Sequence, residues 1–221
     1  MKNKAIFLSH PIANNMPLYG GSNDIKITQS SSILSGDTAN SLKLLMPNHA
    51  GTHLDVPFHF YQNGRKLTEY LPSDWIFQNP TCVDIGETKE GYLIDYQDVS
   101  KFINDKNDLL LIRTGFEKYR DKVSYWQKNP GLSENLAKNL RTKHPNIRAV
   151  GVDVISITSR LNRQEGRKAH LEFLGSHYDS SPIVLIEDMS LESYSNKIST
   201  VIIAPLLISD ADGAPCTVFA W

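Results

Sequence analysis

Residues 48–60 read Asn-His-Ala-Gly-Thr-His-Leu-Asp-Val-Pro-Phe-His-Phe and carry the strongest pattern in the chain. Three of the seven histidines, His49, His53 and His59, lie here within eleven residues, together with Asp55. All four polar side chains stand at odd positions, and in an extended chain the odd positions share one face. The spacing therefore predicts that the four side chains gather on one side of the backbone.

The same stretch is predicted to be extended rather than helical. Gly51 and Pro57 interrupt it, which argues against the helical geometry of a His-x-x-x-His zinc site. The even positions are apolar and are expected to face a core: Leu54, Val56, Phe58 and Phe60. One face of the stretch is thus predicted to carry chemistry and the other to pack.

Imidazole and carboxylate groups on one face suit zinc, manganese or iron. The two cysteines, Cys82 and Cys216, stand outside the cluster and in no ligand spacing. A set of satisfied polar residues on a half-exposed strand is the alternative. Three histidines and an aspartate on one face favour the metal site over that alternative.

Composition limits the classes of partner. The chain has 221 residues with 23 basic and 24 acidic side chains, and it is interpreted as a single domain, 1–221. A net charge of -1 favours neither nucleic acid nor anionic membranes, so a small molecule is the expected partner. No segment has the length of a membrane span or a secretory leader, and the two cysteines form no disulfide framework. The expected location is the cytoplasm.

The remaining periodicities predict a mixture of strands and helices. The expected strands are 5–8, 24–29, 41–46, 82–85, 108–113, 147–154, 183–186, 200–204 and 217–221. One helix is expected at 133–143, capped by Ser133, and another at 167–174, ended by Gly175. The run 108–113 is expected to be buried on both faces. Because the elements do not alternate strictly, the predicted fold class is α+β with a mixed sheet.

The pattern His-x-Gly-Thr-His-x-Asp-x-Pro-x-His at 49–59 resembles the signature of the metal-dependent cyclase family, which includes bacterial kynurenine formamidases and isatin hydrolases. Further blocks resemble family segments in the same order along the chain: 8–12, 16–20, 111–115, 129–133, 151–153 and 211–215. The resemblance implies an α+β fold of the swivelling β/β/α type, a mixed sheet with flanking helices.

The resemblance also implies roles for the residues of the signature. His49, His53 and Asp55 would be metal ligands, with Asp55 able to bridge two ions. His59 would be the general acid and base. The implied cofactor is Zn²⁺, as one or two ions, with Mn²⁺ as the other possibility.

Two further ligands are implied at a distance along the chain. His170 matches the family histidine, and Glu187 matches the glutamate at the end of the next strand. The segment 176–182 between them is longer than in kynurenine formamidases, which leaves the second metal position open. Glu172 and His177 remain rival ligands.

Two more residues fall within family blocks. Tyr19 stands where formamidases tend to have a tryptophan against the substrate, so a substrate-binding role is implied; an ordinary half-buried aromatic is the alternative. Asp212, in Ala-Asp-Gly, is predicted to form a turn.

The function implied by the resemblance is a metal-dependent amidohydrolase acting on a small aromatic amide, similar to arylformamidases. Metal-bound hydroxide would attack the carbonyl, with His59 transferring the proton. A lactam or lactone hydrolase, a cyclase or dehydratase on another small molecule, and a non-catalytic metal-binding protein are the alternatives. Family members commonly assemble, so a homo-oligomer, dimer or tetramer, is also implied.

Overall fold

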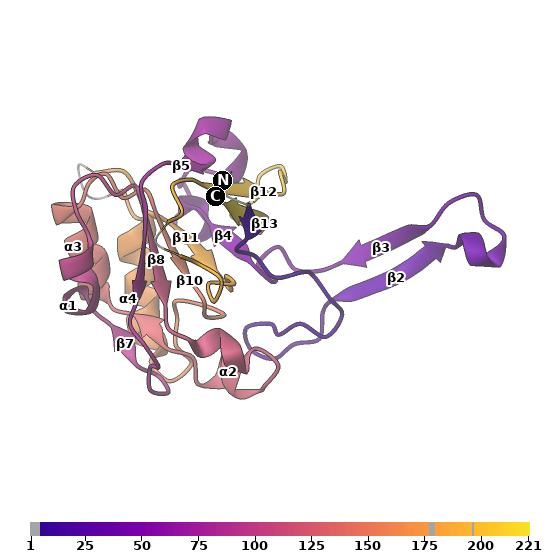
Figure 1. Cartoon of the computed structure of the whole chain (residues 1–221), viewed down its shortest axis with the longest axis horizontal. Helices are drawn as coiled ribbons and strands as arrows, with labels where there is room; N and C mark the ends of the chain where they lie inside the picture. The colour runs from indigo at the N-terminus through magenta and orange to yellow at the C-terminus, as the bar shows by residue number, and fades with distance from the viewer. Residues whose placement is uncertain (1–4, 177–179, 196) are drawn as a thin grey trace.

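The computed structural model describes residues 5–176, 180–195 and 197–221, and a nine-stranded mixed sheet forms its centre (Figure 1). The order across the sheet is β5 (Ile76–Phe77), β12 (Val201–Pro205), β13 (Gly213–Ala220), β4 (His53–Asp55), β11 (Val184–Glu187), β10 (Ala149–Val152), β8 (Leu109–Arg113) and β6 (Pro80–Asp84), with β1 (Ile6–Phe7) against β13. The pairs within β11, β10, β8 and β6 are parallel, whereas β4, β13, β12, β5 and β1 pair antiparallel. Strand β4 therefore lies at the junction of the two halves, and the predicted mixed sheet is confirmed.

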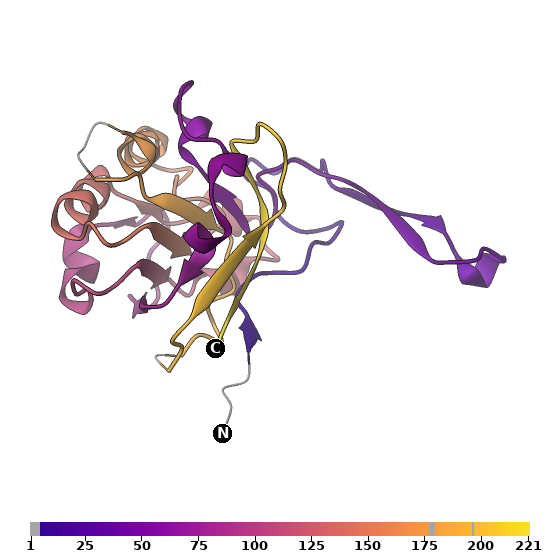
Figure 2. The ribbon, with the colours of Figure 1, turned by 90° about the horizontal axis from the view of Figure 1, so that it is seen from above.

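The two longest helices, α3 (Glu134–Lys143) and α4 (Arg163–Leu174), lie side by side against the parallel half of the sheet (Figure 2). Helix α3 begins as predicted, because the Ser133 hydroxyl accepts a hydrogen bond from the Leu136 amide at 3.0 Å. Helix α4 begins four residues earlier than predicted. It ends before Gly175, which has an extended conformation (φ -71°) instead of the left-handed one typical of a terminal glycine. Among the described residues, none of the helices combines the length and apolar character needed to cross a bilayer.

Shorter elements complete the body. They are α1 (Tyr96–Val99), α2 (Ser124–Gln127), the parallel pair β7 (Leu93–Ile94) and β9 (Gly131–Leu132), and the 3-10 turns η1 (Ile33–Ser35), η2 (Pro57–His59), η3 (Leu67–Glu69), η4 (Pro72–Trp75), η5 (Ser100–Phe102) and η6 (Phe116–Tyr119). None of them was predicted from the sequence.

Strand β8 is buried on both faces, as predicted. Leu110 and Ile112 pack with the residues of the helical face, including Leu136. Leu109 and Leu111 point the other way, into a second core that includes Leu54. The sheet thus separates two apolar layers, and its strands are held rigidly between them.

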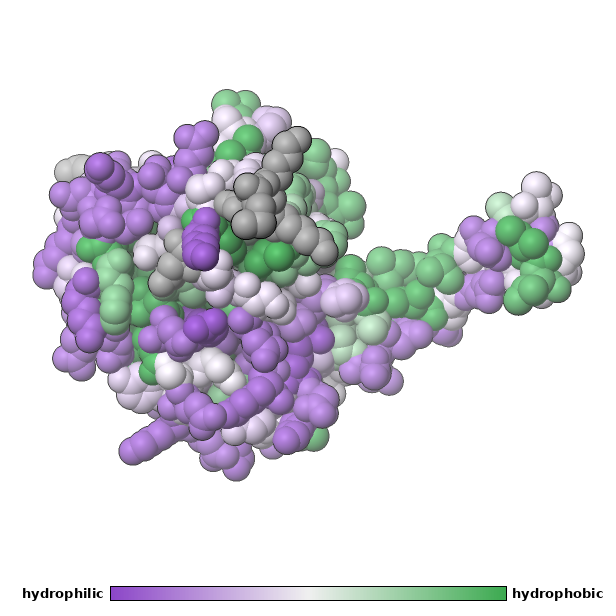
Figure 3. Space-filling model, viewed as in Figure 1, coloured by the Kyte–Doolittle hydropathy of each residue, from purple (hydrophilic) through white to green (hydrophobic). Residues whose placement is uncertain are grey.

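The predicted strands near residues 24–29 and 41–46 form a separate two-stranded arm. β2 (Lys26–Ser31) and β3 (Ser41–Leu45) pair antiparallel with each other and extend away from the body (Figure 1). All five residues of β3 are exposed. Apolar surface runs along the arm (Figure 3).

Candidate metal centre

Strand β4 lies at the centre of the site. Its alternation directs the side chains of His53 and Asp55 to one face, while Leu54 is fully buried in the core on the other. Antiparallel pairing with β11 places Glu187 opposite His53. Pairing with β13 on the other side places Gly213 opposite Asp55. Residues from three distant segments of the chain therefore meet at this strand.

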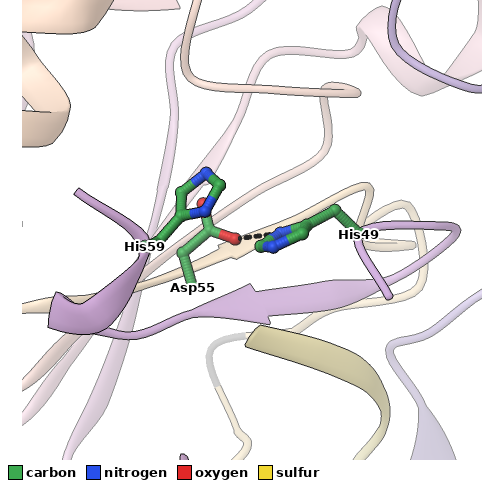
Figure 4. Close-up of side chains that lie close together, drawn as sticks. All are labelled: His49, Asp55 and His59. Atoms are coloured by element: carbon green, nitrogen blue, oxygen red, sulfur yellow. Dashed lines mark hydrogen bonds and ion pairs between the residues drawn. The ribbon is translucent and has the colours of Figure 1, made fainter. Parts of the chain in front are cut away.

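The prediction of one continuous extended stretch from 48 to 60 was wrong. Gly51 has a left-handed backbone (φ 66°), and the chain turns into η2 at Pro57. His49 and His59 thus approach Asp55 from turns on either side of β4 rather than from a shared strand face (Figure 4). The four polar side chains still converge, but through turns.

Four groups form a buried ring: His53, Asp55, His170 and Glu187, each at most 5% exposed. The Nε2 atom of His53 lies 3.7 Å from Asp55 Oδ1 and 3.4 Å from Glu187 Oε2. The Nε2 atom of His170 lies 3.6 Å from Asp55 Oδ2 and 3.5 Å from Glu187 Oε1. These separations are longer than typical hydrogen bonds. They match the edge of a tetrahedron of donor atoms around zinc, roughly 3.4 Å for bonds of about 2.1 Å.

Hydrogen bonds orient both imidazoles in this ring. His53 Nδ1 donates to the Gly51 carbonyl at 2.8 Å, and His170 Nδ1 donates to the Gly166 carbonyl at 2.9 Å. Because a carbonyl can only accept, each Nδ1 carries the hydrogen. In the neutral rings, the Nε2 lone pairs then face the carboxylates, an arrangement that a cation between them stabilises.

The two carboxylates dominate the electrostatics of the ring. Burial lowers the pKa of His170, but the carboxylates of Asp55 and Glu187 outweigh burial and raise that pKa to about 9. Burial and the charge of Asp55 raise the pKa of Glu187, but the neighbouring imidazoles of His170 and His53 outweigh both effects and lower that pKa to about 2. The two carboxylates are therefore ionised and demand positive charge at this point, either protons on the rings or a metal ion.

His49 and His59 share a carboxylate that lies outside the ring. His49 Nδ1 is 2.7 Å from Asp55 Oδ1, and its Nε2 is 3.0 Å from Asp212 Oδ2. His59 Nδ1 is 2.7 Å from the same Asp212 oxygen. Hydrogen bonding to His49 is the largest of the effects that hold the pKa of Asp212 below its usual range. Asp212 was predicted to form a turn; it does stand at a bend before β13, but its carboxylate binds two histidines, so the prediction missed its main contacts.

Two groups of donor atoms can each hold a cation. One comprises His49, Asp55 and His59, and the other His53, Asp55 and Glu187; within each group the atoms lie within 4.8 Å of one another. Asp55 belongs to both groups. Its Oδ1 faces His49 and His53, while its Oδ2 faces His170. The donor set fits a divalent metal, and Asp55 is placed to serve two positions.

The seven residues to which the resemblance assigned metal-binding, acid–base or substrate-binding roles all line one pocket of about 670 Å³: His49, His53, Asp55, His59, His170, Glu187 and Tyr19. Phe60 packs against the core of the helical face, as predicted, and it also lines this pocket, stacked on His170 with ring centroids 4.7 Å apart. Among the rival ligands, Glu172 does not line the pocket, and His177 lies outside the described residues.

Residues 6–159 match the family model Cyclase, described as "Putative cyclase". The chain is 29% identical over 217 residues to a kynurenine formamidase of Bacillus anthracis, covering 96% of this chain and 94% of that protein.

Two solved structures share the fold. Isatin hydrolase A from Labrenzia aggregata, bound to benzyl benzoate, superposes with a TM-score of 0.80 at 17% identity, covering 98% of this chain and 93% of that one. A "predicted metal-dependent hydrolase" from Bacillus stearothermophilus superposes with a TM-score of 0.73 at 21% identity, covering 98% and 97%. The α+β fold expected from the resemblance is therefore confirmed.

Proposed function

The chain belongs to the Cyclase family, and on that premise we propose that it is a metal-dependent hydrolase that cleaves an amide C–N bond of a small molecule. The observation that carries the proposal is the buried ring, in which two imidazole Nε2 atoms face two carboxylates at 3.4–3.7 Å. The relatives named kynurenine formamidase support an N-formyl or cyclic amide of an aromatic amine as the substrate.

The proposed cofactor is Zn²⁺, as one or two ions, with Mn²⁺ as the second choice. The residues that would hold it are His49, His53, Asp55, His170 and Glu187. A bound divalent cation supplies a Lewis acid for the carbonyl and lowers the pKa of the water bound to it to about 7. Neutral imidazole and carboxylate donors without a thiolate suit both of these metals.

His59 is proposed as the general acid and base. It lines the pocket, and its side chain is partly exposed, so a substrate can reach it. Asp212 accepts the Nδ1 hydrogen of His59, which leaves Nε2 free to take a proton from water and return it to the leaving nitrogen. Tyr19 and Phe60 supply aromatic surface for the substrate.

The assembly is proposed to be a homo-oligomer, a dimer or tetramer of a one-domain chain. One sheet draws its strands from β1 near the start to β13 near the end, which supports a single domain. The arm exposes Leu42 and Leu45, at 70% and 64%, beyond the body. An isolated two-stranded hairpin is marginally stable, so a second copy packed on the arm would stabilise it.

The test combines metal removal with a substrate panel of N-formylkynurenine, isatin and a simple lactone. We expect hydrolysis of an amide to fall at least 100-fold on chelation and to return with Zn²⁺ or Mn²⁺, with one or two ions per chain by elemental analysis. His59→Gln should lower kcat by about 10²- to 10⁴-fold while the metal stays bound. His53→Ala should lose metal.

Each outcome separates the possible functions. Activity that survives complete metal removal contradicts metal dependence, and an unchanged rate in His59→Gln contradicts its role. Turnover of the lactone alone would favour a lactonase. Bound metal without turnover of any substrate would favour a cyclase or dehydratase on another molecule, or a non-catalytic protein.

A further inference from the structure

Three arginines in or beside the metal pocket differ from the other five arginines of the chain. Four of the eight arginines form ion pairs with carboxylates: Arg65, Arg113, Arg120 and Arg148. Arg141 is buried and donates to backbone carbonyls. The remaining three, Arg160, Arg163 and Arg167, form no ion pair with a carboxylate in residues 5–176, 180–195 or 197–221.

These three side chains gather at one place. Arg163 and Arg167 stand one turn apart on α4 and line the same pocket as His59 and the buried ring. Arg160 itself does not line the pocket, but its guanidinium lies 5.6 Å from the centre of the ring of Tyr19, which does. Both Arg163 and Arg160 lie close enough to Tyr19 for their charges to oppose the effect of burial, which raises its pKa.

Aromatic rings border the same positive charges. The Arg167 guanidinium lies 6.0 Å from the centre of the Phe60 ring, which itself stacks on His170. Arg160 lies 5.7 Å from the Trp126 ring as well as against Tyr19. A planar substrate in this pocket would therefore contact aromatic faces and reach guanidinium groups at once.

A metal at the centre leaves this positive charge unbalanced. One divalent cation is neutralised by the two carboxylates of Asp55 and Glu187, and a second adds further positive charge. In either case Arg163 and Arg167 keep their charge without a described counter-ion. A cleft lined by one sign of charge concentrates ligands of the opposite sign. The planar guanidinium fork matches the two oxygens of a carboxylate.

We propose that Arg163 and Arg167 bind a carboxylate carried by the substrate, so that the site selects anionic aromatic amides over neutral ones. This inference rests on the proposed amide hydrolysis at the same site and specifies its substrate class. Arg160 adds a third positive charge at the Tyr19 wall of the pocket.

The kinetic test uses the zinc-loaded chain and two matched amides, 2-formamidobenzoate and the neutral 2-formamidobenzamide. We expect the wild type to prefer the carboxylate at least tenfold in kcat/KM. In Arg163→Gln/Arg167→Gln this preference should fall at least tenfold, mainly through a higher KM for the carboxylate. Lys168→Gln is the matched control, because it removes a positive charge from the same helix without lining the pocket.

A binding test separates this inference from the proposed reaction. Calorimetry compares benzoate with benzamide on the zinc-loaded wild type, the double variant and Lys168→Gln. Benzoate should bind at least tenfold more tightly to the wild type and to Lys168→Gln than to the double variant, while benzamide binding changes less. If neither amide is cleaved but benzoate binding still depends on the arginines, the proposed reaction fails and the carboxylate site stands. If the double variant keeps the wild-type preference for the anion, the inference is wrong.

Discussion

Asp212 shows which contacts a local pattern can report and which it cannot. Ala-Asp-Gly indicates a turn because the signal is local, and a bend is present there. The partners of Asp212, His49 and His59, lie 163 and 153 residues away along the chain. The contact exists only because β13 pairs with β4, which no short motif encodes. The cluster at 49–59 was recoverable because its members are close in sequence.

His170 and Glu187 were harder to predict from the sequence than the cluster at 49–59 but easier than the contacts of Asp212. Neither stands in a local ligand spacing, and only the resemblance to the cyclase family pointed to them. The lengthened segment 176–182 left the second metal position open. In the structure the two side chains lie close together, with His170 Nε2 and Glu187 Oε1 3.5 Å apart.

Asp212→Asn should impair proton transfer while leaving the metal in place. The amide cannot carry the negative charge that stabilises a protonated His59, and its NH₂ group can donate to Nδ1 and favour the wrong tautomer. We expect kcat to fall by at least about 100-fold with a smaller change in KM. Steady-state kinetics at saturating zinc, with metal content measured on the same sample, checks this prediction.

Asn48→Ala is the matched control for that variant. Asn48 donates to the other carboxylate oxygen of Asp212 at 2.7 Å and to the Gly213 carbonyl, and it contacts neither His49 nor His59 by hydrogen bond. Its loss should reduce kcat far less. Equal losses in the two variants would mean that Asp212 acts by holding the loop in place rather than by orienting His59.

At the scale of elements, the confirmed predictions are those whose cause is local or repeated. Helix α3 has its capping serine and its apolar side, and β8 has its apolar run. Strand β4 is only three residues long and lies between the left-handed Gly51 and the turn at Pro57. It is a strand because it pairs with neighbouring strands on both of its edges. Strand β13 begins four residues before the predicted start because its first residues pair with β4. Tertiary pairing outweighs propensity in both strands.

Gly213→Ala should disturb this pairing. A Cβ at residue 213 would collide with the Leu54 carbonyl oxygen of β4 and lie 2.6 Å from His49 Cε1. Neither the backbone of β4 nor the imidazole of His49 leaves room for it. Overpacking of this kind costs roughly 1–3 kcal/mol. At about 2–4 °C per kcal/mol for a chain of this size, Tm should fall by several degrees, and zinc affinity should fall with it.

Gly86→Ala provides the comparison for the Gly213 variant. A Cβ at Gly86 meets no atom within 4 Å, although its φ of 72° strains any other residue. Gly86→Ala should lower Tm in a thermal melt, but its zinc affinity in a titration should equal that of the wild type. Wild-type zinc affinity in Gly213→Ala would contradict a role for close β4–β13 packing in placing His49.

At the scale of the whole molecule, the composition of the chain did not foresee the arm. Its strands were predicted at 24–29 and 41–46, but the sequence pattern of these strands does not indicate that they extend away from the body. An alternating strand predicts one buried face, and all five residues of β3 are exposed. The apolar side chains of Leu42, Leu44 and Leu45 are therefore left 70%, 49% and 64% exposed.

The proposed oligomer supplies that cover and can be tested at the arm. If a second copy buries the leucines of β3, Leu42→Asp/Leu44→Asp places two charges in an apolar contact and should dissociate the assembly. Sedimentation or light scattering should give the wild type at least twice the 24.8 kDa chain mass and the variant a single chain mass. Val123→Asp, at a position 58% exposed beside α2 on the body, should leave the assembly intact. A wild type that runs as a monomer at all concentrations contradicts the oligomer, whereas an oligomer that persists in the double variant places the interface elsewhere on the molecule.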